Sequence, residues 1–244
     1  MFPPSVERWR VLAGEECQGL PVDLVLAIVK KESSGQPGLV SHDPVPSSYT
    51  SSEMNACGLP YELRNRDLGM MQIGPSTWRG FVDRTGSKIT PCDLASRTAA
   101  GARLQLRAGC SILRARLELV RTLEPSSFPW PAGPLTDDHV LLGRLAYAFG
   151  WGGLLARWNA AIAAGYPHTF GGLEAHHGTP VKTFRGARIV LADFRSGGSS
   201  SGAPQPYHPP RPRPRPSSDA GAGVLLLLAA GLLAYGAATR RRTT

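Results

Sequence analysis

The sequence has few aromatic residues (7% of 244) and only four cysteines, Cys17, Cys57, Cys92 and Cys110. None of the four forms a C-x-x-C pair or stands at metal-ligand spacing from a histidine, so the cysteines do not indicate a zinc site. An even number of cysteines permits two disulfides in an oxidising compartment. Four free, partly buried thiols are the alternative.

Acidic residues are also scarce. The chain has 18 of them against 27 lysines and arginines, which gives a net charge of +9. Removing residues 211–244 takes away six arginines and one aspartate and leaves a net charge of +4. No basic run interleaved with aromatics occurs before residue 200, and no nucleic-acid-binding motif is present, so a nucleic-acid partner is not expected. A mildly basic domain is suited to an anionic polymer.

The sequence lacks a set of alternating strand patterns, and its N-terminus lacks the basic and continuous apolar regions of a conventional secretory signal. Apolar residues instead recur at helical spacing, which predicts a mainly α fold. We expect helices at about 1–17, 22–31, 74 onward, 93–123, 137–148 and 151–164, with a proline-rich break at about 125–134. Residues 179–194 either add a strand or pack against the core. His176 and His177 are expected in a polar loop, because no further ligands follow at metal-site spacing.

Glu32 ends an apolar helical run and is the most informative residue. Val22, Val25, Leu26 and Val29 form one predicted buried stripe, and Glu32 falls on or beside it. A carboxyl at an apolar boundary is expected to have a raised pKa, because desolvation disfavours its charged form. A carboxyl that keeps its proton near neutral pH can protonate a leaving oxygen.

Three segments accompany Glu32 in a recognisable order. Glu32 and Ser33 are followed by Pro37 and Ser41, which matches the pattern E-S-x-x-x-P-x-x-x-S. Gly-Met-Met-Gln-Ile with Pro-x-Thr follows at 69–77, and Ala-Tyr-Ala-Phe-Gly lies at 146–150. Over about residues 18–165 the chain therefore resembles the soluble lytic transglycosylase family, which has the goose-type lysozyme-like fold. It departs from that family at Ala148, where the family usually has Asn, and in the turn-rich insertion 42–68, which is expected beside the cleft.

The resemblance implies cleavage of the β-1,4 bond between N-acetylmuramic acid and N-acetylglucosamine in peptidoglycan. Glu32 would first protonate the leaving oxygen and then act as base on the muramyl 6-hydroxyl, which gives a 1,6-anhydro product. The resemblance further implies that Gln72 binds the sugar through its amide, that Ser41 and Tyr147 line the site near Glu32, and that Met71 forms an apolar wall. No metal or other cofactor is implied, and a monomer is expected.

Two other functions stay open. A hydrolysing muramidase would need a second carboxylate to activate water, and Asp43 and Asp67 are the candidates. The other function is that of a non-catalytic wall-binding protein on a degenerate lysozyme fold. The presence of Ala148, where the family usually has Asn, favours this alternative.

Composition changes sharply after residue 195. We predict a lysozyme-like domain at 1–195, a Gly/Ser/Pro/Arg-rich linker at 196–219, a transmembrane helix at 220–239 and a basic tail at 240–244. Arginines flank the apolar segment on both sides, so charge alone leaves its orientation open. The expected placement is a membrane anchor with the catalytic domain facing the cell wall, in the periplasm or outside the cell. A phage-encoded protein and a cleaved sorting tail are the other arrangements considered.

Overall fold

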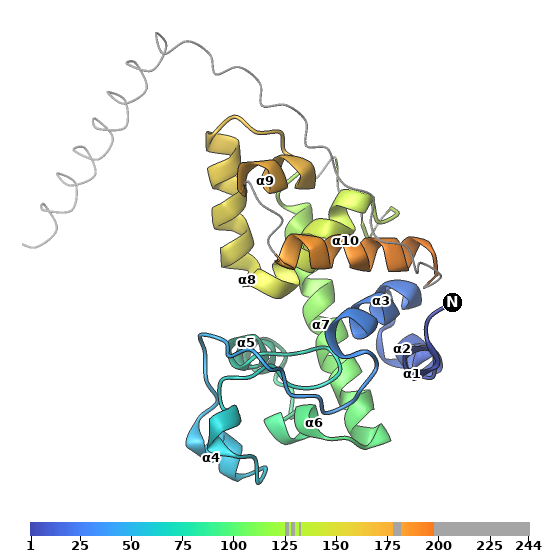
Figure 1. The fold of residues 1–244 in the computed structure, drawn as a ribbon, viewed down its shortest axis with the longest axis vertical. Helices are drawn as coiled ribbons and strands as arrows, with labels where there is room; N and C mark the ends of the chain where they lie inside the picture. Colours follow the sequence, from blue (N-terminus) through green and yellow to red (C-terminus); the bar gives the residue numbers. More distant parts are fainter. Residues whose placement is uncertain (125–126, 128–129, 132, 178–181, 198–244) are drawn as a thin grey trace, which may run out of the picture. The chain divides into compact units, whose positions relative to one another are not determined.

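The computed structural model describes residues 1–124, 127, 130–131, 133–177 and 182–197. All of them belong to one compact unit (Figure 1). The fold is mainly helical, as predicted, and the only strand-like pairings in the described part are single bridges of Leu68 with Val40 and with Ile73. The described helices are α1 (Pro4–Glu7), α2 (Arg10–Glu16), α3 (Val22–Ser33), α4 (Ser51–Asn55), η1 (Tyr61–Leu63), α5 (Pro75–Thr85), α6 (Pro91–Ala95), α7 (Ala99–Arg121), α8 (Asp137–Ala163), α9 (Phe170–His177) and α10 (Lys182–Arg195).

Helix α3 is buried around its whole circumference. The sequence predicts a single apolar stripe, but each residue from Leu24 to Val29 is at most 1% exposed. The reason is that α1 and α2 contact the helix on one part of its surface and α10 on another. A helix that is hydrophobic all round is typical of a protein interior. The helix continues past the predicted end at residue 31 and stops at Ser33, where Ser34 adopts a left-handed conformation with φ 53°.

The predicted long helix near residues 93–123 is two helices. Ser96 is extended, with ψ 134°, and it separates α6 from α7. The Thr98 side chain then accepts a hydrogen bond from the backbone N–H of Gly101 and so begins a new helix. Further along α7, a Cβ at Gly109 would collide with Met71. Glycine at this position therefore allows the Met71 segment to lie directly on α7.

Helix α8 bends at Gly150. This residue has φ 73° and ψ 161°, a conformation that few residues other than glycine adopt. The sequence predicts separate helices before and after this point, and the bend is where they meet. Thr136 caps the first half by accepting from the backbone N–H of His139. The bend matters for function because it turns the backbone around Phe149 and Gly150 toward a surface pocket.

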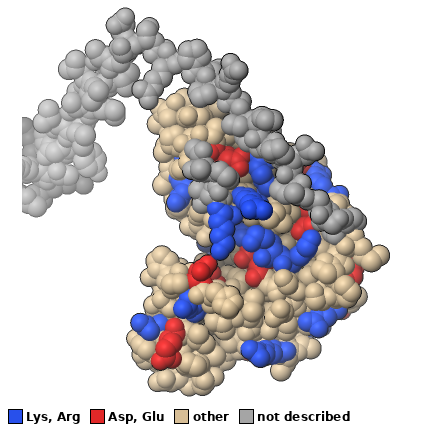
Figure 2. Space-filling view, viewed as in Figure 1, with Lys and Arg blue, Asp and Glu red and all other residues tan. Residues whose placement is uncertain are grey.

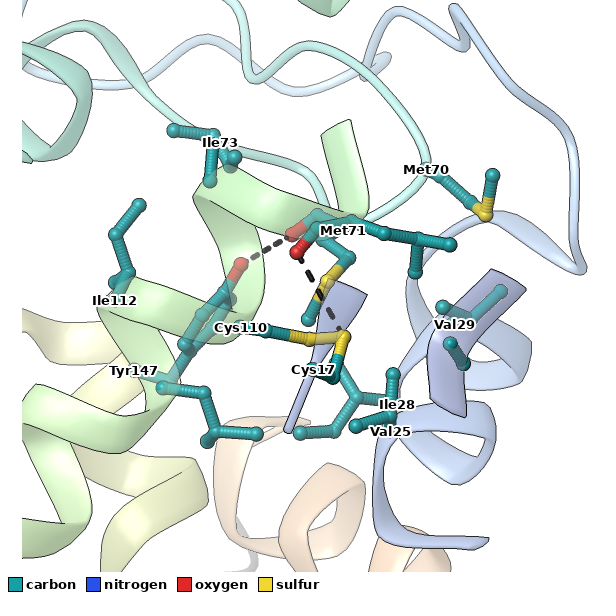
Figure 3. Close-up of a cluster of buried hydrophobic side chains, with 14 of the residues drawn as sticks. Cys17, Val25, Ile28, Val29, Met70, Met71, Ile73, Cys110, Ile112 and Tyr147 are labelled. Atoms are coloured by element: carbon teal, nitrogen blue, oxygen red, sulfur yellow. Dashed lines mark hydrogen bonds between the residues drawn. A yellow bond between two sulfur atoms is a disulfide. The ribbon is translucent and has the colours of Figure 1, made fainter. Parts of the chain in front are cut away.

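Both possible disulfides are formed, which decides between the two states that the sequence left open. Cys17 at the end of α2 is bonded to Cys110 in α7, within the main apolar core (Figure 3). Cys57, just after α4, is bonded to Cys92 in α6. The second disulfide therefore ties the predicted insertion 42–68 to the rest of the fold.

The end of the described chain is helical. Residues 182–195 form α10, which packs against α3 and α8, so packing against the core was the correct alternative and a strand was not. His176 and His177 lie in the last turn of α9, and the prediction of a loop there is wrong. The predicted linker lies outside the described residues except for its first two residues, and the transmembrane helix and basic tail lie wholly outside them. Among the residues that the structure does describe, none forms a helix long and apolar enough to cross a membrane.

Candidate active site

A pocket of about 350 Å³ opens where the end of α3, the insertion and the bend of α8 meet. This volume is within the usual range for sites that bind small molecules or sugars. Figure 2 shows the surface hollowed between the region of α8 and the region of α5. The described residues that line the pocket are Glu32, Val45, Pro46, Ser47, Asp67, Gln72, Gly74, Ser76, Thr77, Arg144, Tyr147, Ala148, Phe149 and Gly150.

Glu32 reaches this pocket from the last turn of α3. Its side chain is 16% exposed, and its Oε1 accepts a hydrogen bond from Nη2 of Arg144 in α8. The side chain of Arg144 is itself only 7% exposed. The sequence predicted apolar surroundings for the Glu32 carboxyl, so the buried guanidinium beside it is a correction to that picture.

Asp67 brings a second carboxylate to the pocket. Burial, and next the negative charge of Glu32, raise the pKa of Asp67 from 3.8 to about 6. Gly74 lies against this carboxylate so closely that a Cβ there would collide with it. Of the two aspartates considered as a second carboxylate, Asp67 is in the pocket. Asp43 is 82% exposed, forms an ion pair with Lys182 and is not among the lining residues.

Ser41 supports Asp67 and does not line the pocket. Its Oγ accepts a hydrogen bond from the backbone N–H of Asp67 at 3.0 Å, and its own N–H donates to the Asp67 carbonyl. The Ser41 hydroxyl also donates to the backbone carbonyl of Asp43 at 3.0 Å. Ser41 therefore fixes the backbone from which the Asp67 carboxylate projects.

Gln72 lies in the pocket with a backbone conformation that is unusual for its residue type, with φ 50°. Its Nε2 donates to the carbonyls of Leu39 and Gly69, at 3.1 and 2.7 Å. Within the described residues, these bonds occupy the amide nitrogen and leave the amide oxygen available to a ligand.

Tyr147 lines the pocket, as the resemblance implied, and its hydroxyl is hydrogen-bonded to the backbone. The hydroxyl donates to the Met71 carbonyl at 2.8 Å (Figure 3). Burial, and next the charge of Glu32, raise the pKa of Tyr147 above its ordinary value. Met71 is fully buried in the core and is not a lining residue, so it supports the pocket from behind and does not form its wall.

The match to a known family agrees with this arrangement. The family model for the transglycosylase SLT domain matches residues 11–120. Residues 11–120 of the chain are therefore similar to the transglycosylase SLT domain. No curated protein and no solved structure matches the chain. The SLT match supports a function of the lytic transglycosylase type that acts on peptidoglycan.

The pocket extends beyond the matched part of the SLT domain. Glu32, Asp67 and Gln72 lie within residues 11–120, whereas Arg144 and Tyr147 come from α8. The motif resemblance in the sequence extends to about residue 165, beyond the end of the family-model match at residue 120. Tyr147 was predicted to line the site because it lies within that longer resemblance. The insertion 42–68 lies beside the pocket, as expected, and contributes Val45, Pro46, Ser47 and Asp67.

Sequence reasoning missed Arg144. A usable signal was present, because Arg144 lies three residues before Tyr147 and so on the same side of a helix. It is also a charged residue in a run of α8 that is buried from His139 to Tyr147. A charge in such a run normally has a buried partner.

Proposed function

We propose that this protein cleaves the β-1,4 bond between N-acetylmuramic acid and N-acetylglucosamine and leaves a 1,6-anhydromuramic acid end. The observation that carries the proposal is the position of Glu32 in a pocket lined by Gln72 and Asp67, within an SLT domain. These residues bring together a proton-transferring carboxyl and an amide oxygen that can accept a hydrogen bond from a sugar.

In the proposed reaction Glu32, in its protonated form, donates its proton to the glycosidic oxygen, and the bond from that oxygen to the muramyl C1 breaks. The Glu32 carboxylate then takes the proton of the muramyl 6-hydroxyl while that oxygen bonds to C1. The departing N-acetylglucosamine keeps the first proton as its 4-hydroxyl. One carboxyl therefore acts as both acid and base, and no water is consumed.

The test is mass spectrometry of peptidoglycan digested with wild type and with Glu32→Gln. The wild type should release anhydro ends, and the variant should release no product above background, because an amide cannot transfer the proton. Glu53→Gln is a suitable control, since Glu53 also accepts from an arginine, Arg79, but lies outside the pocket. Activity of Glu32→Gln within tenfold of wild type would remove Glu32 from the mechanism.

A hydrolysing muramidase is the second candidate, and the position of Asp67 favours it over a non-catalytic protein. Asp67 shares the pocket with Glu32, so it could activate a water that attacks C1. The product would then carry a reducing end, which is heavier than the anhydro end by one water. Asp67→Asn separates the two reactions, because hydrolysis should stop in this variant whereas formation of anhydro ends should continue. A protein that binds peptidoglycan and releases neither product would be the wall-binding alternative.

We also propose that the domain works outside the cytoplasm, at the cell wall. Two disulfides support this placement, because disulfides persist mainly in oxidising compartments. Anchoring through residues 220–239 is part of the proposal and rests on the sequence alone. Fractionation tests it directly, since an anchored full-length chain should stay with membranes after carbonate extraction.

A further inference from the structure

Arg144 carries the only positive charge among the described residues that line the pocket, and Glu32 and Asp67 carry the only negative charges. Among the described residues, Glu32 is the one carboxylate that forms an ion pair with Arg144. Two of its nitrogens, Nε and Nη1, are buried without a hydrogen-bond partner in the described structure. Its guanidinium carbon also lies 6.0 Å from the centre of the Tyr147 ring. The cation is therefore committed to one carboxylate at the pocket surface.

Burial of the Arg144–Glu32 ion pair is energetically unfavourable if the pair serves only to stabilise the fold. Removing a guanidinium from water costs several kcal/mol, and apolar side chains of similar volume often replace buried ion pairs without loss of stability. The neighbours of Arg144 along α8 include Leu141, Leu142 and Leu145, all buried, so an apolar residue would suit this position. Arg144 and Glu32 instead both line the pocket, which indicates a role for the pair in the site.

We infer that Arg144 is a positioning residue for the reaction: it holds the Glu32 carboxylate in place and stabilises the negative charge that Glu32 acquires when it donates its proton. The inference rests on the proposed role of Glu32 as acid and base. It adds a residue from α8, outside the matched SLT segment, to the machinery. Arg144 need not touch the substrate, because it acts through Glu32.

The charge on Glu32 has few other influences. Asp67 and Tyr147 face the same pocket, and the negative charge of Asp67 opposes that of Glu32. The two lysines that precede Glu32 in α3 both face α10: Lys30 pairs with Asp193, and Lys31 lies against Gly186. Arg116 of α7 acts electrostatically on Tyr147 but does not line the pocket. Among the described lining residues, Arg144 is therefore the cation that offsets the two carboxylates.

The test uses the full-length protein with Arg144→Met and Arg144→Lys, and follows kcat and KM on peptidoglycan across pH. In Arg144→Met we expect kcat to fall by roughly 10- to 100-fold with little change in KM, because the charged intermediate state of Glu32 loses its stabilising partner. The pH at which activity is lost on the alkaline side should rise in this variant, because removing a cation that contacts a carboxylate favours the protonated form of that carboxylate. Arg144→Lys should return this alkaline limit to its wild-type position.

Arg79→Met is the matched control. Arg79 pairs with Glu53 at 2.8 Å outside the pocket, so its loss should leave the alkaline limit unchanged. An Arg144→Met variant that folds and keeps the wild-type alkaline limit would overturn the inference. Should that variant not fold, Arg144→Gln decides, because it keeps hydrogen-bond donors but removes the charge: a several-fold lower kcat with a raised alkaline limit supports the inference, and a wild-type kcat and limit overturn it.

The Glu32→Gln variant distinguishes a failure of the proposed function from a failure of the inference about Arg144. If that variant stays active, the proposed function fails and the role of Arg144 fails with it. If Glu32→Gln is inactive while Arg144→Met behaves like wild type, only the inference about Arg144 fails.

Discussion

The hydroxyl of Tyr147 donates a hydrogen bond of 2.8 Å to the backbone carbonyl of Met71. This bond joins α8 to the segment that carries Gln72, and it is buried. The two residues are 76 positions apart in the chain. The bond therefore links the matched SLT segment to a helix beyond it, at the point where both line the pocket.

Tyr147→Phe should lower the free energy of unfolding by about 1–2 kcal/mol, because the Met71 carbonyl loses its donor and stays buried. Activity should fall too, since Gln72 adjoins the released carbonyl and has a strained backbone. Denaturant unfolding and peptidoglycan digestion on the same preparation measure both effects.

Tyr49→Phe is the control for that variant. The Tyr49 hydroxyl donates to the Ile73 carbonyl at 3.1 Å and is also buried. This carbonyl belongs to the peptide bond between Ile73 and Gly74, whereas the Met71 carbonyl belongs to the peptide bond that Gln72 itself forms, and Tyr49 does not line the pocket. It should lose similar stability and keep its specific activity. Equal activity losses in both variants would indicate that Tyr147 acts only through the fold.

Asp67 should make the protein less stable as pH rises from about 4 to about 6. The folded pKa of about 6 exceeds the unfolded value near 3.9, so the folded state binds this proton more tightly. The resulting stabilisation is fully present below pH 4 and is lost as pH rises through 6. With partial exposure taken into account, the change is about 2 kcal/mol.

Asp67→Asn should remove this pH dependence and leave the variant more stable than wild type at pH 7. The measurement is the difference in unfolding free energy between the two proteins across pH 3–8, because other titrating groups cancel in that difference. A difference that stays constant with pH would show that the carboxyl of Asp67 is not desolvated.

The local parts of the fold could be predicted from the sequence. The apolar run that starts at Val22 gave α3, Pro75 began α5 where a missing N–H costs little, and Asp137 began α8. The small break between α6 and α7 was missed, because the apolar spacing continues across Ser96 and only the cap at Thr98 marks a new start.

The long-range contacts of the site could not be predicted in the same way. Motif order indicated Glu32 and Gln72, but the Glu32–Arg144 pair joins residues 112 positions apart, and no local pattern encodes such a contact. The circumferential burial of α3 was missed for a related reason, since it depends on α10, a segment whose helical character was not recognised.

The Cys57–Cys92 disulfide should matter more for activity than for the core. It closes 35 residues and ties the insertion, whose Val45 to Ser47 form one pocket wall, to α6. Replacing both cysteines by serine should reduce peptidoglycan cleavage several-fold and cost about 3–4 kcal/mol or less of stability by the chain-entropy relation. Turnover and thermal melting of the double variant measure these effects.

The Cys17–Cys110 disulfide provides the comparison. It closes 93 residues within the core, so its removal by alanine should cost more stability, up to about 4–5 kcal/mol. The protein that remains folded should keep its specific activity. A larger loss of activity on removal of Cys17–Cys110 than on removal of Cys57–Cys92 would show that the pocket wall formed by the insertion does not need this disulfide to hold it in place.

A chain truncated after Ser196 should fold and stay active, whereas one truncated after residue 181 should not fold. The difference between them is α10, which buries Phe184, Ala187 and Val190 to 1% exposure or less. It also supplies Asp193, whose carboxylate accepts from the Nζ of Lys30 in α3 at 2.7 Å. Removing α10 would expose the helix that carries Glu32 and leave Lys30 without this partner.

The 1–196 chain should fold because the Gly-, Ser- and Pro-rich sequence that it lacks buries too little apolar surface to join a core. Circular dichroism, thermal melting and peptidoglycan digestion of the two truncated chains give the comparison. A folded, active 1–181 chain would show that α10 is dispensable for holding Glu32 in the pocket. A 1–196 chain that fails to fold would show instead that residues after 196 contribute to the domain, and the predicted boundary at 195 would then be wrong.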